Sequence, residues 1–172
     1  MNPHQDSTMP KPSAMQRDSE GRLVRLTIDS TTPLPVSANN EWLVAIDGSV
    51  HAQRGLTEAM RLTRKMMVMD CVLHLVNVQQ WLSHEAAETK LAQRGWEASA
   101  EARALLNAAG QPWRLHVAMG DSAECIVDTV KEIGCSGIII GSRGLSSVES
   151  LLIGSVAYKV IQQSPVSVLV VR

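Results

Sequence analysis

The stretch GIIIGSRGLSSVESLLIGS, residues 137–155, decides the fold class of this sequence. It opens with the apolar run Gly137–Ile140, which has the length of a short buried strand, and Gly141-Ser-Arg-Gly144 follows directly. After nine intervening residues, Gly154-Ser155 begins a segment that is predicted to be the last helix. A buried strand, a glycine-bearing turn and a helix in that order indicate a parallel sheet covered by helices.

The same alternation of strands and helices extends over residues 41–172. Short apolar runs predict five strands, at Leu43–Asp47, Val72–Val78, Arg114–Met119, Gly137–Ile140 and Val166–Val171. Apolar residues at helical spacing, with Gly110, Asp121, Gly134 and Ser164 as end signals, predict helices over 56–67, 85–109, 121–134 and 154–163. The expected fold is therefore α/β, a five-stranded parallel sheet in a Rossmann-like, open three-layer α/β/α sandwich.

Residues 1–40 differ in composition from the rest of the chain. Several prolines stand there among Ser, Thr, Asn and Asp, with too few apolar residues to fold alone. We therefore expect a flexible N-terminal extension over residues 1–40 and one domain over residues 41–172. Within the extension, Arg22–Asp29 alternates apolar and polar residues, which fits a short strand at a sheet edge and equally a chance pattern in a disordered tail.

The composition limits the classes of partner. The 172 residues, of which 45% are hydrophobic, suffice for one ordinary globular domain. The 16 basic and 17 acidic residues are nearly balanced, which argues against nucleic acid as the main partner because phosphate backbones select a concentrated basic face. Apolar runs stay shorter than the roughly 18 residues of a membrane span. Cys71, Cys125 and Cys135 form no C-x-x-C pair, so we expect a soluble cytoplasmic protein with reduced, structural cysteines and no membrane partner.

The glycine segment has the chemistry of a phosphate site. Glycine adopts positive φ and lacks a side chain, so Gly141 and Gly144 allow a bound group to approach the backbone closely. The amides of Ser155 and Val156, at a helix start, are unpaired donors that suit phosphate oxygens. The Ser155 hydroxyl adds a donor or a ligand for a divalent ion, and Arg143 supplies a positive charge. The alternative is structural, with turn glycines, an ordinary helix start and a solvated arginine.

The end of the first predicted strand faces the same crevice, because open parallel sheets bind ligands beyond the carboxyl ends of their strands. In Ala45-Ile46-Asp47-Gly48-Ser49, the Asp47 carboxylate can accept hydrogen bonds from ribose hydroxyls. The second strand ends near Val78, which would offer main-chain groups and an apolar wall to a base. Asp47 before Gly48-Ser49 is also good turn and capping chemistry, so both roles of this aspartate stay open.

The spacing G-2x-G-9x-G-S, formed by Gly141, Gly144 and Gly154-Ser155, resembles the nucleotide-binding motif of the universal stress protein family. Further segments resemble landmarks of that family, namely LVAIDGS (43–49), MGDSAECIV (119–127) and SPVSVLVVR (164–172). The resemblance spans residues 41–172 and implies the adenine nucleotide alpha hydrolase-like form of the fold. It also implies bound ATP, AMP or ADP, with Mg²⁺ held by the phosphates, and a homodimer.

Residue by residue, the resemblance implies a complete ligand site. Its members are Ile46, Asp47 and Val78 for the base and ribose, Ile140 and Gly141 on the ribose side, Arg143, Gly144, Gly154, Ser155 and Val156 at the phosphates, and Ala45 and Gly120 to complete the set. The chain departs from the family pattern in two places. Ala45 stands where some nucleotide-binding members have proline, and the leader of residues 1–40 is not part of the family domain.

The leading hypothesis is an ATP-binding universal stress protein with a regulatory or protective role in the stress response. The P-loop pattern G-x-x-x-x-G-K-[ST] is absent from the sequence, no catalytic base is assigned, and slow ATP hydrolysis stays compatible with bound Mg²⁺. Single histidines such as His74 and His116 lack metal-ligand spacing, so no metal site of protein ligands is predicted.

The alternative is a dimeric interaction module of the same fold that binds no nucleotide. The apolar last strand, Val166–Val171, has the composition of an interior strand or of an edge strand. We favour an edge that pairs with a second copy, because an exposed apolar edge invites pairing with another chain.

Overall fold

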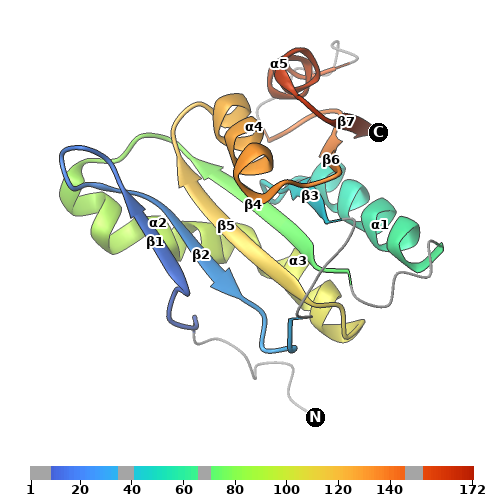
Figure 1. The fold of residues 1–172 in the computed structure, drawn as a ribbon, viewed down its shortest axis with the longest axis horizontal. Coiled ribbons are helices and arrows are strands. Elements are labelled where there is room, and N and C mark those ends of the chain that lie inside the picture. Colours follow the sequence, from blue (N-terminus) through green and yellow to red (C-terminus); the bar gives the residue numbers. More distant parts are fainter. Residues whose placement is uncertain (1–8, 35–40, 66–70, 146–152) are drawn as a thin grey trace.

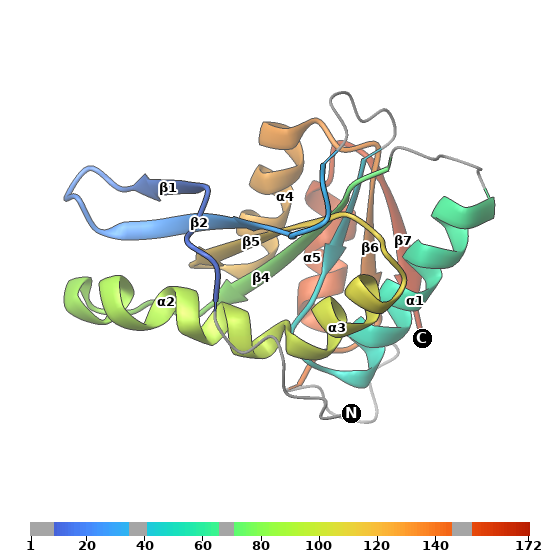
Figure 2. The ribbon, with the colours of Figure 1, turned by 90° about the horizontal axis from the view of Figure 1, so that it is seen from below.

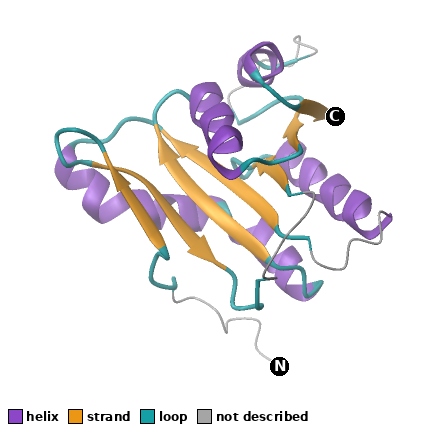
Figure 3. Ribbon diagram, in the orientation of Figure 1, coloured by secondary structure: helices purple, strands orange, loops and turns teal. Residues whose placement is uncertain are grey.

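A computed structural model of the protein describes residues 9–34, 41–65, 71–145 and 153–172 (Figure 1). The strands are β1 (Ala14–Arg17), β2 (Leu23–Asp29), β3 (Trp42–Ala45), β4 (Leu73–Gln79), β5 (Trp113–Met119), β6 (Gly137–Gly141) and β7 (Ser167–Val171). The helices are α1 (Val50–Lys65), α2 (His84–Ala98), α3 (Ala100–Ala108), α4 (Ser122–Ile133) and α5 (Ser155–Gln163). From β3 onward each strand but the last is followed by one helix, or by two after β4, and the five predicted strands are confirmed as β3 to β7. Figure 3 shows the helices and strands in separate colours. Met66 and Met67, at the end of the first predicted helix, lie outside the described residues.

One sheet with the strand order β1-β2-β5-β4-β3-β6-β7 crosses the molecule. The strands β5, β4, β3, β6 and β7 are parallel, which confirms the predicted α/β class. Along the chain, the sheet grows from β3 through β4 to β5 on one side and then from β6 to β7 on the other. The direction of growth reverses at β3, so the carboxyl ends of β3 and β6 flank the position where open α/β sheets bind ligands.

The hairpin of β1 and β2 corrects the expected number of strands from five to seven. β2 pairs antiparallel with β5, and Leu23, Leu26 and Ile28 are buried in the core. Burial of these three apolar side chains stabilises the pairing of β2 with β5. The composition of the surrounding residues did not predict this pairing. The alternation at residues 22–29 therefore marks a strand, and this part of the predicted flexible extension belongs to the sheet. Residues 1–8 and 35–40 of that extension lie outside the described residues, and a domain boundary at residue 40 stays a prediction.

Helices cover both faces of the sheet, as the turned view in Figure 2 shows. The helices α1, α2 and α3 pack on one face and bury Leu56, Leu91 and Leu106 against Leu75 and Val117. The helices α4 and α5 pack on the other face, where Ile126, Val130 and Val160 meet Leu43 and Ile138. These three layers are the sandwich that was predicted from the order of elements.

The long helix predicted over residues 85–109 is two helices, α2 and α3, which meet at Ser99. The buried Ser99 hydroxyl donates to Trp96 O at 3.1 Å and accepts from Arg103 Nε at 3.1 Å. Such side-chain to main-chain bonds compete with the regular helical ladder, and they give the physical reason for the break. Gly110 ends the second of these helices with a positive φ of 63°, as predicted.

Candidate functional site

The Asp47 carboxylate, just beyond β3, accepts hydrogen bonds from two main-chain amides. Oδ1 accepts from Ser49 N at 2.9 Å, which is the turn chemistry predicted for this loop. Oδ2 accepts from Leu145 N at 3.1 Å, and Leu145 lies in the turn after β6. Asp47 therefore ties the end of β3 to the glycine turn. The structural role that the sequence left open for Asp47 is thus present, beside the strand at which the direction of sheet growth reverses.

Two glycines of the turn allow neighbouring chain segments to approach closely. A Cβ on Gly141 would lie 2.7 Å from the carbonyl carbon of His51 and 2.9 Å from Ala52 N, so α1 packs on β6 only because this residue has no side chain. A Cβ on Gly144 would lie 2.7 Å from Asp47 Oδ2. Gly141 is thus required by main-chain contacts within the protein, whereas a side chain at Gly144 would displace the Asp47 carboxylate.

Helix α5 begins beside the same turn. Gly154 is its N-cap, and the Gly154 amide donates to Ser142 O at 2.7 Å. The first helical hydrogen bond runs from Tyr158 N to Gly154 O at 3.0 Å, so the amides of Ser155 and Val156 precede the helical ladder. These amides lie at the positive end of the helix dipole, next to the turn that Asp47 holds.

The start of α5 differs from the starts of α1, α2 and α4, which are capped by their own side chains. Ser49 Oγ accepts from Ala52 N, and Ser83 Oγ accepts from Ala86 N, each at 3.2 Å. Asp121 caps α4 as predicted, and amide hydrogen bonds together with Lys159 lower the pKa of its carboxyl. Glycine has no side chain that could accept such bonds, so the cap of α5 leaves room for an external acceptor.

The residues predicted at the base end lie along neighbouring strand ends. The buried Ile46 donates from its amide to Val76 O at 2.9 Å, and its carbonyl accepts from Asn77 Nδ2 at 2.8 Å. Val78 is partly buried in β4, and Gly120 follows β5 with φ of 145°. A hollow of about 260 Å³ opens beside Ile46, between the start of α1 and the junction of α2 and α3. Asn77, at the predicted end of the second strand, thus ties β4 to the end of β3 through its side-chain amide.

The structure brings part of the predicted set together and leaves part of it apart. Around the ends of β3 and β6 it gathers Ala45, Ile46, Asp47, Ile140, Gly141, Arg143, Gly144, Gly154, Ser155 and Val156. Val78 and Gly120 lie on the next strands, β4 and β5, and residues 146–152 of the motif lie outside the described residues. The contacts made by Leu145 N and Ser142 O were missed, because main-chain groups have no signature in residue type.

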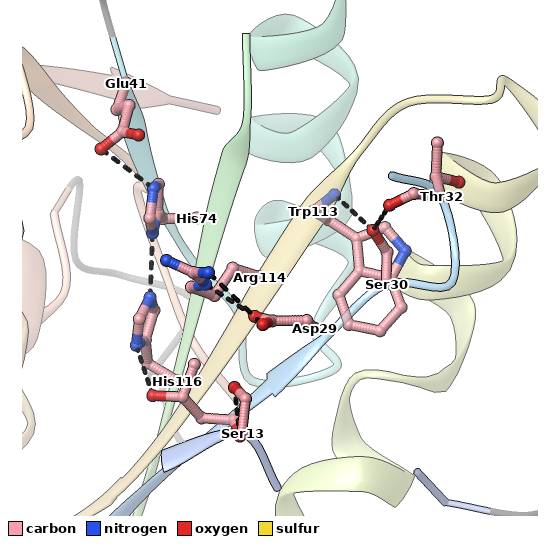
Figure 4. A network of polar contacts seen from close by, with 10 residues as sticks. Ser13, Asp29, Ser30, Thr32, Glu41, His74, Trp113, Arg114 and His116 are labelled. Carbon is pink, nitrogen blue, oxygen red and sulfur yellow. Dashed lines mark hydrogen bonds and ion pairs between the residues drawn. The ribbon is translucent and has the colours of Figure 1, made fainter. Parts of the chain in front are cut away.

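A second polar cluster crosses the sheet from the start of β3 to β2 (Figure 4). His74 Nδ1 lies 2.9 Å from His116 Nε2, His74 Nε2 lies 3.2 Å from the Glu41 carboxylate, and His116 Nδ1 lies 3.2 Å from Thr27 Oγ1. Burial lowers the pKa of His74, and burial together with the charges of His74 and Arg114 lowers the pKa of His116 to about 3. These histidines stand singly in the sequence, because only the pairing of β4 with β5 makes them neighbours.

The described residues also bear on metal binding, membrane insertion and thiol ionisation. Nowhere in residues 9–34, 41–65, 71–145 and 153–172 do three His, Cys, Asp or Glu side chains gather so that they could hold a metal ion. No helix within these ranges combines the length and apolar character needed to cross a bilayer. Burial raises the pKa of the Cys71 thiol to about 11 and that of the Cys135 thiol to about 12.

The sequence of this chain is similar to those of known proteins. Residues 40–172 match the universal stress protein family. The universal stress protein YxiE of Bacillus subtilis is 30% identical over 147 residues, which cover 77% of this chain and 99% of that protein.

Two solved structures show the same fold. A universal stress protein from Archaeoglobus fulgidus in complex with dAMP gives a TM-score of 0.61 at 22% identity, covering 79% of this chain and 100% of that one. A family protein from Arabidopsis thaliana with AMP bound gives 0.59 at 16% identity, covering 77% and 91%. The family match spans β3 to β7, the glycine turn and the start of α5. The chain therefore belongs to the universal stress protein family.

Proposed function

We propose that this protein binds an adenine nucleotide beyond the carboxyl ends of β3 and β6 and acts as a regulatory or protective protein in the stress response. The observation that carries the proposal is the start of α5, where Gly154 caps the helix without a side chain next to the turn held by Asp47. Two relatives of the same fold whose solved structures are named as complexes with dAMP and AMP support an adenine nucleotide as the ligand.

In this proposal the phosphates lie at the start of α5. The amides of Ser155 and Val156 donate to phosphate oxygens, and the helix dipole favours the negative charge. The Ser155 side chain is exposed and adds a hydroxyl donor, while the half-buried Arg143 supplies positive charge from the turn. The glycine at position 154 keeps the approach to these amides open.

The ribose and base would extend from that point toward β4. Among the described residues, Ser49 N donates to Asp47 Oδ1 and Leu145 N donates to Oδ2, and a carboxylate has about four lone-pair sites that ribose hydroxyls could share. Ala45, Ile46 and Ile140 lie at the strand ends along this path, and Val78 and Gly120 would line the base end. The two roles of Asp47 are therefore compatible.

Magnesium, in this proposal, is held mainly by the phosphates of the nucleotide. Mg²⁺ usually binds through few protein ligands and keeps several waters, and the Ser155 hydroxyl is the group of this chain that would reach it. The ion would neutralise phosphate charge. We assign no catalytic base.

A calorimetric titration with ATP and magnesium tests the proposal. The protein is denatured, any released small molecule is identified by mass spectrometry, and the refolded protein is titrated. We expect saturable binding by the wild type and its loss in Gly154→Val, whose branched side chain would crowd Ser142 O and Arg143 Cα, 3.4 and 3.6 Å from the added Cβ. Gly154→Ala is the matched control and should still bind, because one methyl fits at these distances.

Circular dichroism should be the same for all three proteins. Binding by Gly154→Val as tight as that of the wild type would refute the placement of the phosphates. A wild-type protein that releases no nucleotide and gives no heat with ATP would favour the interaction module instead.

We also propose a homodimer through β7. This strand ends the sheet, and its residues Val168 to Val171 are only half-buried. An apolar edge with unpaired main-chain groups favours pairing with a second copy. Sedimentation should give a dimer for the wild type and a monomer for Val170→Lys, since a charge at the edge opposes pairing; an unchanged dimer in this variant would place the interface elsewhere.

A further inference from the structure

We propose that Trp81 forms an additional wall at the base end of the site, and that Arg22 of the N-terminal hairpin holds it there. The indole would contact the adenine base and contribute to the affinity for nucleotides. This inference rests on the proposed function, because it names a further contact within the same crevice.

The position of Trp81 in the fold is the first observation. β4 ends at Gln79, whose carbonyl accepts from Gly120 N at 3.0 Å, so the ends of β4 and β5 stay side by side beyond their last paired residues. A Cβ on Gly120 would lie 3.5 Å from Cζ2 of Trp81. The indole therefore lies against a residue that the sequence placed in the ligand site, at the carboxyl edge of the sheet.

The exposure of Trp81 is the second observation. Its exposed fraction is 62%, whereas Trp113 is buried and Trp42 and Trp96 are half-buried. Trp81 is thus the one tryptophan of this chain with a large surface open to solvent. A planar base can stack on the exposed face of the indole, and such stacking does not depend on specific hydrogen bonds.

The third observation is the contact that orients the ring. The guanidinium carbon of Arg22 lies 5.1 Å from the centroid of Trp81, in the arrangement of a cation–π contact. Arg22 is itself held by Asp18, with Nε to Oδ2 at 3.0 Å and the Arg22 amide to Oδ1 at 2.9 Å. An exposed side chain that is held in one orientation loses less conformational entropy when a ligand contacts it.

These contacts give the hairpin of β1 and β2 a role at the site. Asp18 and Arg22 flank the turn between the two strands, and this turn lies outside the residues that match the family. Because β2 is antiparallel to β5, the turn points toward the carboxyl edge of the parallel strands. The hairpin thus brings a positive charge to this edge and contacts the Trp81 indole, which follows β4, where the base is proposed to bind.

Calorimetry with two probes tests the inference, because ATP carries a base and inorganic triphosphate does not. Trp81→Ala should weaken ATP binding by about tenfold, the size expected for loss of one base–aromatic contact, and leave triphosphate binding unchanged. Trp81→Phe retains an aromatic ring and should restore most of the ATP affinity. Arg22→Ala should weaken ATP binding in the presence of Trp81 and have no further effect in Trp81→Ala.

Tryptophan fluorescence gives an independent readout. ATP should quench the wild-type emission, and the quenching should disappear in Trp81→Phe although that protein still binds. Arg17→Ala, which removes a charge from the same hairpin where it pairs with Glu88, is the control for charge alone and should bind ATP as the wild type does.

The outcomes separate this inference from the proposed function. If the wild type binds ATP, Trp81→Ala binds it equally well and ATP leaves the emission unchanged, Trp81 is not at the base and the inference is wrong while the proposed function stands. Equal losses of ATP and triphosphate binding in Trp81→Ala would also overturn it, because they would indicate a general disturbance of the site. A wild type that binds neither ATP nor AMP refutes both.

Discussion

Gly141→Ala is the most direct test of how the site is built. The added Cβ would lie 2.7 Å from the His51 carbonyl carbon, 2.8 Å from its oxygen and 2.9 Å from Ala52 N. These atoms are main chain in the first turn of α1, so no side-chain rotation can relieve the contact. Helix α1 must move away from β6, and this motion disturbs a packed interface in the larger core.

The size of the effect follows from that geometry. An ordinary carbon contact is about 3.5 to 4 Å, so α1 and β6 would have to separate by close to 1 Å. Overpacking of a well-packed site costs about 1 to 3 kcal/mol in free energy of unfolding. For a chain of this length, each 1 kcal/mol shifts Tm by about 2 to 4 °C. We expect the variant to fold and to unfold at a distinctly lower temperature and urea concentration.

Gly55→Ala is the matched control, because Gly55 lies in α1 at the same interface. Its added Cβ would lie 3.6 Å from Ile139 Cγ2 and 3.7 Å from Gly141 N, which are ordinary contact distances. Alanine is favoured over glycine in a helix by up to about 1 kcal/mol, so this variant should be more stable than the wild type. Urea unfolding followed by circular dichroism measures both. A Gly141→Ala midpoint at or above that of the wild type would refute the packing argument.

Three further predictions concern stability. Asp121→Ala should lower the free energy of unfolding by about 1 kcal/mol, because the N-cap bonds to the first amides of α4 are lost, and an unchanged urea midpoint would contradict this role. Gly95→Ala should also destabilise, since its Cβ would lie 2.3 Å from Val117 Cγ2 and α2 must lift from β5; a Tm equal to that of the wild type would count against the close packing. The pKa of His116 is about 3 in the folded protein and about 6.5 when unfolded, so the unfolded chain takes up a proton that the folded chain does not. The free energy of unfolding should therefore fall as the pH decreases from about 6.5 toward 3, by at most about 1.4 kcal/mol per pH unit, and urea midpoints at pH 7.5, 6.0 and 5.0 should fall less steeply in His116→Gln.

The strands β3 to β7 and most helix ends could be predicted from the sequence because their signals are local. Buried parallel strands are continuous apolar runs, and Asp121 and Gly134 mark the two ends of α4 by chemistry within a few residues. The break at Ser99 was missed, since it depends on bonds that the hydroxyl makes once it is buried between α2 and α3.

The glycine turn illustrates how far prediction of a site can go. Its spacing predicted a close approach of backbone in this segment, and the contacts of Gly141 and Gly144 show such an approach. The structure adds that Gly141 is required by the main chain of α1 and that Gly144 lies against the Asp47 carboxylate, contacts between segments far apart in the sequence. Residue type alone does not distinguish a glycine that admits a ligand from one that admits a helix.

The sequence by itself determined the parallel α/β class, the family and the segment that carries the candidate site, because periodicity and motif spacing are properties of consecutive residues. Only the tertiary structure decided that β2 pairs with β5, that Asp47 bonds to Leu145, and that Arg22 lies over Trp81. Each of these contacts joins residues from different elements. Their partners are selected by burial and by the order of strands in the sheet, which exist only once the chain has folded.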